Sequence, residues 1–186
     1  MRASFQHLEP ILAGLKGAPG DFAEFGVWRG ETFMPLAALA KAQNRLCHAI
    51  DSFLGMAEPT EDDRNPQGVQ EYVKGALNVG GSGEFRKKVA RLPNVRIWEG
   101  YLPGILPRIR IPAGLAFCHV DLDHYTPTLA VLGWCWERTN PGGVLCCHDW
   151  LPQYDCMATK AAREFMARFR IAPAGESASL HIWWRK

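Results

Sequence analysis

Short, continuously apolar segments alternate with amphipathic segments along most of this chain. The apolar segments are typical of buried strands, and we predict strands at residues 22–25, 46–50, 95–98, 115–120 and 144–147. Apolar positions at helical spacing predict helices at residues 5–16, 31–44, 82–92, 126–139 and 155–168, with Ser82 and Thr126 as caps. This alternation of strands and helices is typical of a parallel, doubly wound α/β sheet.

Two further segments change this picture. Residues 169–173 and 179–184 are predicted as strands with no helix between them, so they must form an antiparallel pair at the C-terminus. Residues 52–81 contain two prolines and an acidic cluster, and we interpret them as a long loop or lid with one helix at 67–78. The prediction is one domain over 1–186, with an N-terminal helix within 1–17 and one mostly parallel sheet of seven strands.

Composition excludes several classes of protein. The chain has 186 residues, of which 47% are apolar and 22% charged, as expected of a globular domain with one sizeable core. A net charge of +2 gives no reason to expect nucleic acid or an anionic membrane as a partner. We find neither a signal peptide nor an apolar run of the roughly 20 residues that a membrane helix needs. Six cysteines without a CxxC pair are expected to be reduced thiols of a cytoplasmic protein.

Polar residues follow all five of the buried strands. In an open α/β sheet, ligands bind outside the carboxyl ends of the strands, so these residues are expected to share one site. They are Glu24 with Gly26, Asp51, Glu99, Asp121 with Asp123, and His148 with Asp149.

The turn from Gly26 to Gly30 points to a cationic ligand. It lacks the Lys and Ser/Thr of a phosphate-binding P-loop and departs from the G-x-G-x-x-G spacing of dinucleotide-binding folds. Glu24 would repel a pyrophosphate but suits an ammonium or sulfonium group. Asp51, 21 residues after Gly30, occupies the position that accepts ribose hydroxyls in nucleotide-binding folds. The simpler alternatives are a tight packing turn and a surface or capping aspartate.

The carboxylates after the last two parallel strands indicate a cation. Asp121, Asp123 and Asp149 would repel one another beside His148 unless a divalent ion, such as Mg²⁺, lay between them. His148 is an unusual Mg²⁺ ligand and would suit Mn²⁺, Fe²⁺ or Zn²⁺ better. Alternatively, one carboxylate caps a helix and another pairs with an arginine. His124 adjoins this group and is a candidate general base.

Four segments in order resemble one known family. Phe22-Ala-Glu-Phe-Gly-Val-Trp-Arg-Gly30 resembles the glycine motif of the macrocin O-methyltransferase (TylF-like) family. Asp51-Ser-Phe-Leu-Gly55, His119-Val-Asp-Leu-Asp-His-Tyr125 and Pro141-Gly-Gly-Val-Leu-Cys-Cys-His-Asp-Trp150 are similar to its other motifs. The resemblance implies a class I, Rossmann-like methyltransferase fold and S-adenosylmethionine as methyl donor. In the better-known members it also implies Mg²⁺-dependent methylation of a sugar hydroxyl.

Combined with the strand-end positions, the resemblance gives a full set of expected roles. Glu24 and Gly26 would approach the methionine moiety and Asp51 the ribose, while Glu99 could face the adenine. Cofactor contacts are predicted at Glu24, Gly26, Val27, Trp28, Gly30, Asp51, Ser52, Glu99, Gly100 and Asp121, metal ligands at Asp123, His148 and Asp149, and a proton acceptor at Asp121 or His124. Mg²⁺ is expected ahead of Mn²⁺, and the acceptor is a small molecule with a hydroxyl group.

Two departures from the family leave other functions open. His148 stands where the family has the first of two acidic residues, and the chain is short at its N-terminus, where part of the usual lid lies. A cofactor-binding module without catalysis, acting as a partner subunit, is therefore the alternative. A homodimer could cover the acceptor site. A metal hydrolase that uses the same carboxylates is a third hypothesis.

Overall fold

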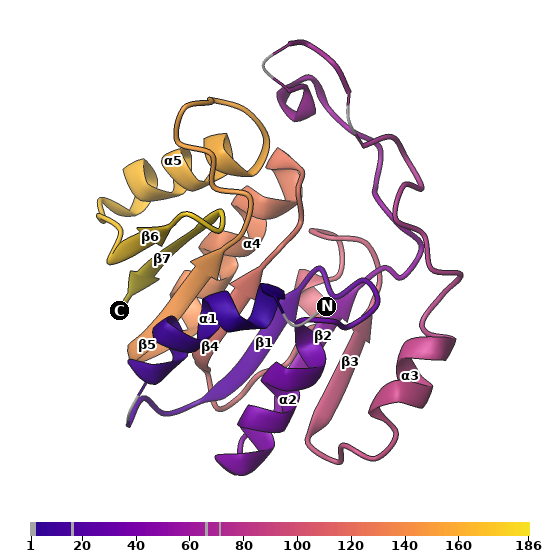
Figure 1. Cartoon of the computed structure of the whole chain (residues 1–186), viewed down its shortest axis with the longest axis vertical. Helices are drawn as coiled ribbons and strands as arrows, with labels where there is room; N and C mark the ends of the chain where they lie inside the picture. Colours follow the sequence, from indigo (N-terminus) through magenta and orange to yellow (C-terminus); the bar gives the residue numbers. More distant parts are fainter. Residues whose placement is uncertain (1–2, 16, 66, 71) are drawn as a thin grey trace.

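The computed structural model describes residues 3–186 except 16, 66 and 71, and these form one seven-stranded sheet (Figure 1). The strands lie in the order β3-β2-β1-β4-β5-β7-β6. Their bounds are β1 Asp21–Phe25, β2 Cys47–Asp51, β3 Val95–Glu99, β4 Leu115–Val120, β5 Thr139–Cys147, β6 Gly175–Ser177 and β7 His181–Arg185. The first five strands are parallel, and β7 pairs antiparallel with both β5 and β6. The predicted fold class is therefore confirmed.

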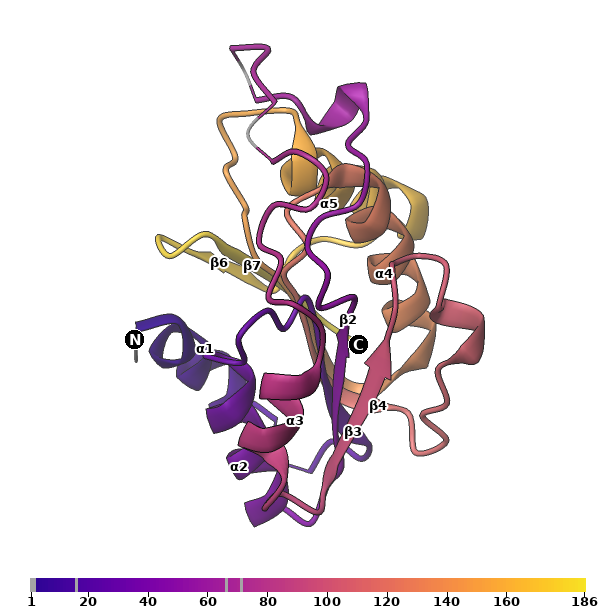
Figure 2. The same cartoon turned by 90° about the vertical axis from the view of Figure 1, so that its right-hand side faces the viewer.

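Helices cover both faces of the sheet (Figure 2). The helices α1 Ala3–Ala13, α2 Phe33–Ala42 and α3 Gly83–Val89 lie on one face, and α4 Tyr125–Arg138 and α5 Met157–Phe169 lie on the other. Each face has its own apolar core, and Phe22 and Phe117 belong to one while Phe25 and Val120 belong to the other. Neighbouring residues of a strand thus point to opposite cores, which is why β1 and β4 are apolar throughout. None of these helices is both long and apolar enough to cross a membrane.

Two predicted elements were wrong. The helix expected at 67–78 is absent from the described residues of that range, which form turns; Gly68 and Gly75 there adopt positive φ angles of 77° and 79°. The strand expected at 169–173 is also absent, because α5 continues to Phe169 and ends at Arg170 in the left-handed conformation. The strand β6 instead occupies Gly175–Ser177, where we predicted a turn.

The boundary between α4 and β5 also differs from the prediction. Asn140, Pro141 and both glycines at 142–143 belong to β5 rather than to a turn before it. The side-chain amide of Asn140 donates to the carbonyl oxygens of Pro19 and Ala113, which fixes the start of β5 beside the segments that precede β1 and β4. A side chain, and not the local backbone preference, therefore decides this boundary.

The described residues of the range 52–81 form an arm that extends past the carboxyl ends of the strands toward α4 and α5 (Figures 1 and 2). The buried carboxylate of Asp63, in the short helix η1 Glu61–Asp63, accepts hydrogen bonds from the backbone N–H of Tyr125 at 2.6 Å and of Thr60 at 2.6 Å. Asp62 forms an ion pair with Lys160 of α5 at 2.6 Å. The arm is therefore attached to the helices at its far end.

Candidate functional site

A pocket of about 310 Å³ lies at the carboxyl ends of the parallel strands. It is lined by most of the residues that the sequence singled out, together with parts of the arm. The predicted residues that line it are Gly26, Trp28, Asp51, Ser52, Gly100, Asp121, Asp123, His124, His148 and Asp149. The strand order explains this, because β2, β1, β4 and β5 are neighbours and end at the same edge of the sheet.

Asp51 holds the glycine turn in place. Its Oδ2 accepts hydrogen bonds from the backbone N–H groups of Val27 and Trp28, each at 2.7 Å, and its Oδ1 accepts one from Phe53 at 2.7 Å. A carboxylate offers about four acceptor positions, so these amides use most of them. The sequence suggested a ribose acceptor at this position. It gave no signal that the same carboxylate fastens the turn to β2.

Gly26 brings the turn into contact with the end of β4. Its φ angle is 87°, and a Cβ at this position would lie 1.7 Å from the carbonyl oxygen of Asp121. Gly30 serves packing instead, because a Cβ there would lie 2.8 Å from the ring of Phe85, and it does not line the pocket. The two glycines of the motif therefore have different roles.

Glu24 lies beneath the pocket and not in its lining. Its side chain is 2% exposed and forms an ion pair with His119 Nδ1 at 2.8 Å. Burial is the main cause that raises the pKa of Glu24 to about 6, and the hydrogen bond to His119 opposes it. His119 is buried in β4 as the partner of this carboxylate.

Of the remaining predicted cofactor residues, some line the pocket and others lie outside it and hold neighbouring segments in place. Val27 is buried in the apolar core, although its N–H reaches Asp51. Glu99 is outside the lining: it accepts a hydrogen bond from Ser82 Oγ at 2.5 Å and pairs with Arg86 of α3 at 3.2 Å. Ser82 therefore contacts β3 instead of capping α3 with its side chain. Ser52 Oγ donates to the carbonyl of Gly55 and so shapes the start of the arm.

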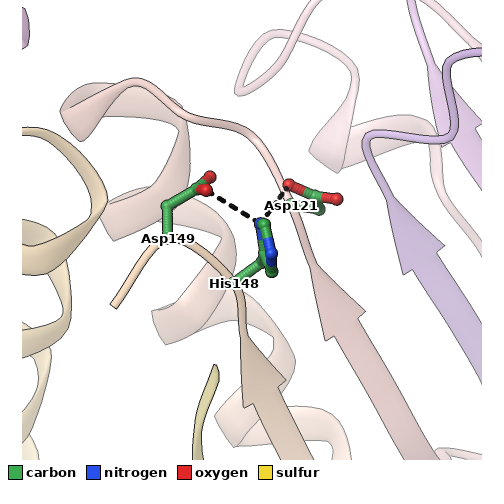
Figure 3. Close-up of side chains that lie close together, drawn as sticks. All are labelled: Asp121, His148 and Asp149. Atoms are coloured by element: carbon green, nitrogen blue, oxygen red, sulfur yellow. Dashed lines mark ion pairs between the residues drawn. The ribbon is translucent and has the colours of Figure 1, made fainter. Parts of the chain in front are cut away.

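A compact group of Asp121, His148 and Asp149 forms one side of the pocket (Figure 3). His148 Nδ1 lies 3.2 Å from Asp121 Oδ1 and 2.8 Å from Asp149 Oδ1. Sheet pairing sets these positions, because the N–H of Asp121 donates to Phe25 and the N–H of His148 donates to Val120. The two carboxylates thus approach one ring nitrogen from neighbouring segments.

The group differs from our prediction in one residue, since Asp121 replaces Asp123 beside His148 and Asp149. Alternation along a continuing strand would direct Asp121 and Asp123 to the same side. The strand β4 ends at Val120, however, and Asp123 adopts a positive φ of 56°, which breaks the alternation. Asp123 still lines the pocket, where burial and then the charges of Asp149 and Asp121 raise its pKa to about 8.

His148 lies within a group of histidines that the sequence did not reveal. Its ring centroid is 4.7 Å from that of His181 and 6.4 Å from that of His119. Burial disfavours a charge on His148, but the carboxylates of Asp121 and Asp149 outweigh it and raise its pKa to about 11. Burial lowers the pKa of His181 to about 3. His181 reaches the site because β7 pairs with β5, an antiparallel neighbour that no local pattern identifies.

The group of Asp121, His148 and Asp149 fits a divalent metal ion. Asp149 Oδ2 is a buried atom with no hydrogen-bond partner among the described residues, and His148 Nδ1 lies at ion-pair distance from both carboxylates without hydrogen-bond alignment to either. One imidazole nitrogen and two carboxylates within 4.8 Å of one another are a donor set that metal sites in proteins use. A cation between them would satisfy the carboxylate oxygen that is otherwise unpaired.

His124 and the arm complete the pocket. His124 precedes α4 as its N-cap residue and is 2% exposed, with a buried Nε2 that has no hydrogen-bond partner among the described residues. Burial lowers its pKa. Three apolar lining residues remain substantially exposed: Trp28 at 37%, Leu77 at 41% and Tyr101 at 42%. The described lining contains no lysine or arginine.

Comparison with known proteins identifies the family. The model of the macrocin O-methyltransferase (TylF) family matches residues 3–186. The chain belongs to this family. The predicted enzyme class, an S-adenosylmethionine-dependent methyltransferase, is confirmed at the level of the family.

Among curated members, the chain is 29% identical to 8-demethyl-8-(2,3-dimethoxy-alpha-L-rhamnosyl)-tetracenomycin-C 4'-O-methyltransferase of Streptomyces olivaceus. That match covers 96% of this chain and 69% of the relative. The chain is 27% identical to mycinamicin III 3''-O-methyltransferase of Micromonospora griseorubida, over 72% of this chain and 56% of the relative. The chain therefore spans between about half and two thirds of the length of these family members.

Solved structures agree with the observed fold. The O-methyltransferase NovP superposes with a TM-score of 0.81 at 23% identity, covering 97% of this chain and 79% of the other. The calicheamicin methyltransferase CalS11 superposes with a TM-score of 0.72 at 22% identity, covering 97% and 77%. At these identities the likeness establishes the fold alone, which is the fold of the family.

Proposed function

We propose that the chain is an S-adenosylmethionine-dependent O-methyltransferase that methylates a sugar hydroxyl of an uncharged small molecule. The family match over residues 3–186 supports the methyl transfer, and both of the curated relatives described above are named as O-methyltransferases. One structural observation carries the proposal for this chain. The glycine turn and the group around His148 face one pocket and touch through Gly26 and the carbonyl of Asp121.

The pocket suits a cationic methyl donor. The sulfonium of S-adenosylmethionine would lie near Asp51, Asp121 and Asp149, all of which line the cavity, with no lysine or arginine in the described lining to repel it. The exposed ring of Trp28 lies on the same lining. In this proposal Glu24 lies beneath the pocket, where it pairs with His119, and does not contact the cofactor.

The reaction would be a direct displacement at the methyl carbon. The acceptor oxygen attacks the methyl group in line, the carbon–sulfur bond breaks, and a methyl ether and S-adenosylhomocysteine leave with the charge of the sulfonium neutralised. Most of the acceleration comes from holding the two reacting groups in line. Asp121, His148 and Asp149 would hold a divalent ion that lowers the pKa of the acceptor hydroxyl.

We assign the acceptor proton to Asp123. It is the pocket carboxylate that neither holds the glycine turn, as Asp51 does, nor faces His148 Nδ1, as Asp121 and Asp149 do. This replaces Asp121, one of the two residues that we expected to act as base. His124 remains the alternative base for comparison, because it also lines the pocket.

The lining favours a neutral glycoside over a nucleotide sugar. A diphosphate needs cationic or amide partners, and the described lining offers carboxylates instead of lysine or arginine. The exposed apolar residues Trp28, Leu77 and Tyr101 suit an apolar or aromatic body attached to the sugar. The apolar part of the acceptor would therefore lie against Trp28, Leu77 and Tyr101.

Transfer of a labelled methyl group from S-adenosylmethionine tests the proposal. We expect product with neutral glycosides of aromatic or macrocyclic compounds and little with thymidine-diphosphate sugars. Asp123→Asn should lower kcat at least about 100-fold, as expected for loss of a general base, with a smaller effect of His124→Gln. Asp155→Asn, a change of the same kind at an exposed residue, should leave kcat unaltered. No transfer to any acceptor with any divalent metal, from a chain that binds the cofactor, would favour the non-catalytic module.

A further inference from the structure

We infer that His148 makes the group of Asp121, His148 and Asp149 select a first-row transition metal ion, such as Fe²⁺, Co²⁺ or Zn²⁺, over Mg²⁺. The inference deepens the proposed function and rests on it, because it names the ion class that this methyl-transfer site would use. It also revises our expectation from the sequence, which put Mg²⁺ first.

The spacing of the two carboxylates around His148 Nδ1 is compatible with that of metal ligands. His148 Nδ1 lies 3.2 Å from Asp121 Oδ1 and 2.8 Å from Asp149 Oδ1. Adjacent ligands of an octahedral ion with bonds of about 2.1 Å are separated by about 3.0 Å, and the two measured distances bracket that value. Yet His148 Nδ1 has no aligned hydrogen-bond partner among the described residues. The ring nitrogen therefore lies close to both carboxylates, with a geometry that is not that of a hydrogen bond to either.

Neighbouring side chains fix the ring in this orientation. The ring of His181 lies edge-on to His148 with centroids 4.7 Å apart, and that of His119 lies edge-on at 6.4 Å. His119 is itself held by Glu24 at 2.8 Å, and both side chains are buried. Rotating His148 away from the carboxylates would require these packed rings to move. The imidazole is thus placed as a ligand before any ion binds.

The chemistry of the donors decides which ion is preferred. Mg²⁺ is a hard ion that takes oxygen ligands and keeps most of its water, and it gains little from an imidazole nitrogen. Fe²⁺, Co²⁺ and Zn²⁺ bind imidazole nitrogen well and tolerate carboxylates in the same site. One fixed nitrogen among oxygens therefore raises affinity for the second class of ion only.

Competition between Co²⁺ and Mg²⁺ tests the inference without an activity assay. Co²⁺ would be titrated into the whole chain and followed by its visible absorption, and Mg²⁺ would then be added to displace it. We expect His148→Asp to lower the ratio of Co²⁺ affinity to Mg²⁺ affinity by about 10- to 100-fold, the usual effect of altering a metal site. Asn44→Asp introduces a carboxylate at an exposed residue after α2, away from the pocket, and should leave the ratio unaltered.

A second measurement uses the unsubstituted protein, in case His148→Asp does not fold. Proton NMR of the Co²⁺ form should show a strongly shifted, exchangeable imidazole N–H signal, which Asn44→Asp also shows. A ratio that is the same in His148→Asp and wild type, the absence of that signal, or no Co²⁺ binding at all would overturn the inference. S-adenosylhomocysteine binding, measured separately without metal, decides the proposed function: its loss would refute the methyltransferase assignment even if the metal preference held.

Discussion

Gly26 is the position where one added methyl group should separate the glycine turn from the end of β4. In Gly26→Ala the new Cβ would lie 1.7 Å from the carbonyl oxygen of Asp121, whereas real contacts of a Cβ stay beyond 3.0 Å. The two segments would therefore have to part by about 1.3 Å, the difference between these distances. The backbone fixes the position of the Cβ, and the oxygen belongs to the backbone, so no side-chain rotation can relieve the clash.

Two costs contribute to the predicted loss of stability. Placing an alanine at a left-handed φ of 87° costs about 1–2 kcal/mol. Forcing packed segments apart costs about 1–3 kcal/mol more. Gly17→Ala separates these costs, because Gly17 has the same φ of 87° and a Cβ there would meet no atom of the other described residues within 4 Å, its chain neighbours aside. We expect Gly26→Ala to lose about 2–5 kcal/mol of unfolding free energy and Gly17→Ala about 1–2 kcal/mol.

Urea unfolding of both variants, followed by tryptophan fluorescence, measures the difference. Gly26→Ala should also weaken binding of S-adenosylhomocysteine, because the displaced segment includes Asp121 on the pocket wall. Equal losses of stability in the two variants, with unchanged ligand affinity in Gly26→Ala, would refute the close contact between turn and strand end. The conclusion that the site is organised around that contact would then be wrong.

Two further predictions concern buried carboxylates. The pKa of Glu24 in the folded chain is raised from 4.5 to about 6, so the folded state binds the proton more tightly and stability falls as the pH rises through this interval. Relative to Glu24→Gln, the unfolding free energy of the wild type should drop by about 2 kcal/mol between pH 4 and pH 7, and parallel pH curves would contradict this. Asp63→Ala should lose about 1–3 kcal/mol and speed proteolysis of the arm, since it leaves the N–H of Tyr125 without its partner. Asp62→Ala, which removes a half-exposed ion pair with Lys160, should cost under about 1 kcal/mol; equal effects of the two substitutions would show that Asp63 does not anchor the arm.

The sheet could be predicted from the sequence because its signals are local: short apolar segments, each followed by polar residues. The runs at 22–25 and 115–120 could only be buried strands, and Asp51, Asp121 and Asp149 follow strands whose ends must meet at one edge. What the sequence could not reveal depends on packing between distant segments. The contact of Gly26 with Asp121 and the arrival of His181 beside His148 follow from strand order and register, which no local pattern encodes.

The arm was misjudged for a related reason. Its predicted helix rested on composition, but its path is set by the buried carboxylate of Asp63 at the start of α4 and by the pair of Asp62 with Lys160. Glu99 was expected at the pocket because it ends a strand, yet Ser82 and Arg86 draw its carboxylate toward α3. In both cases a side-chain partner far along the chain outweighs the local signal.

Titration calorimetry of S-adenosylhomocysteine into the whole chain tests the central claim most directly. The account predicts saturable binding of one ligand per chain in the wild type, retained in Gly17→Ala and strongly weakened in Gly26→Ala. No heat of binding to the folded wild-type chain would contradict the claim that this pocket binds the methyl donor. Binding of full strength to Gly26→Ala would contradict its placement against the glycine turn.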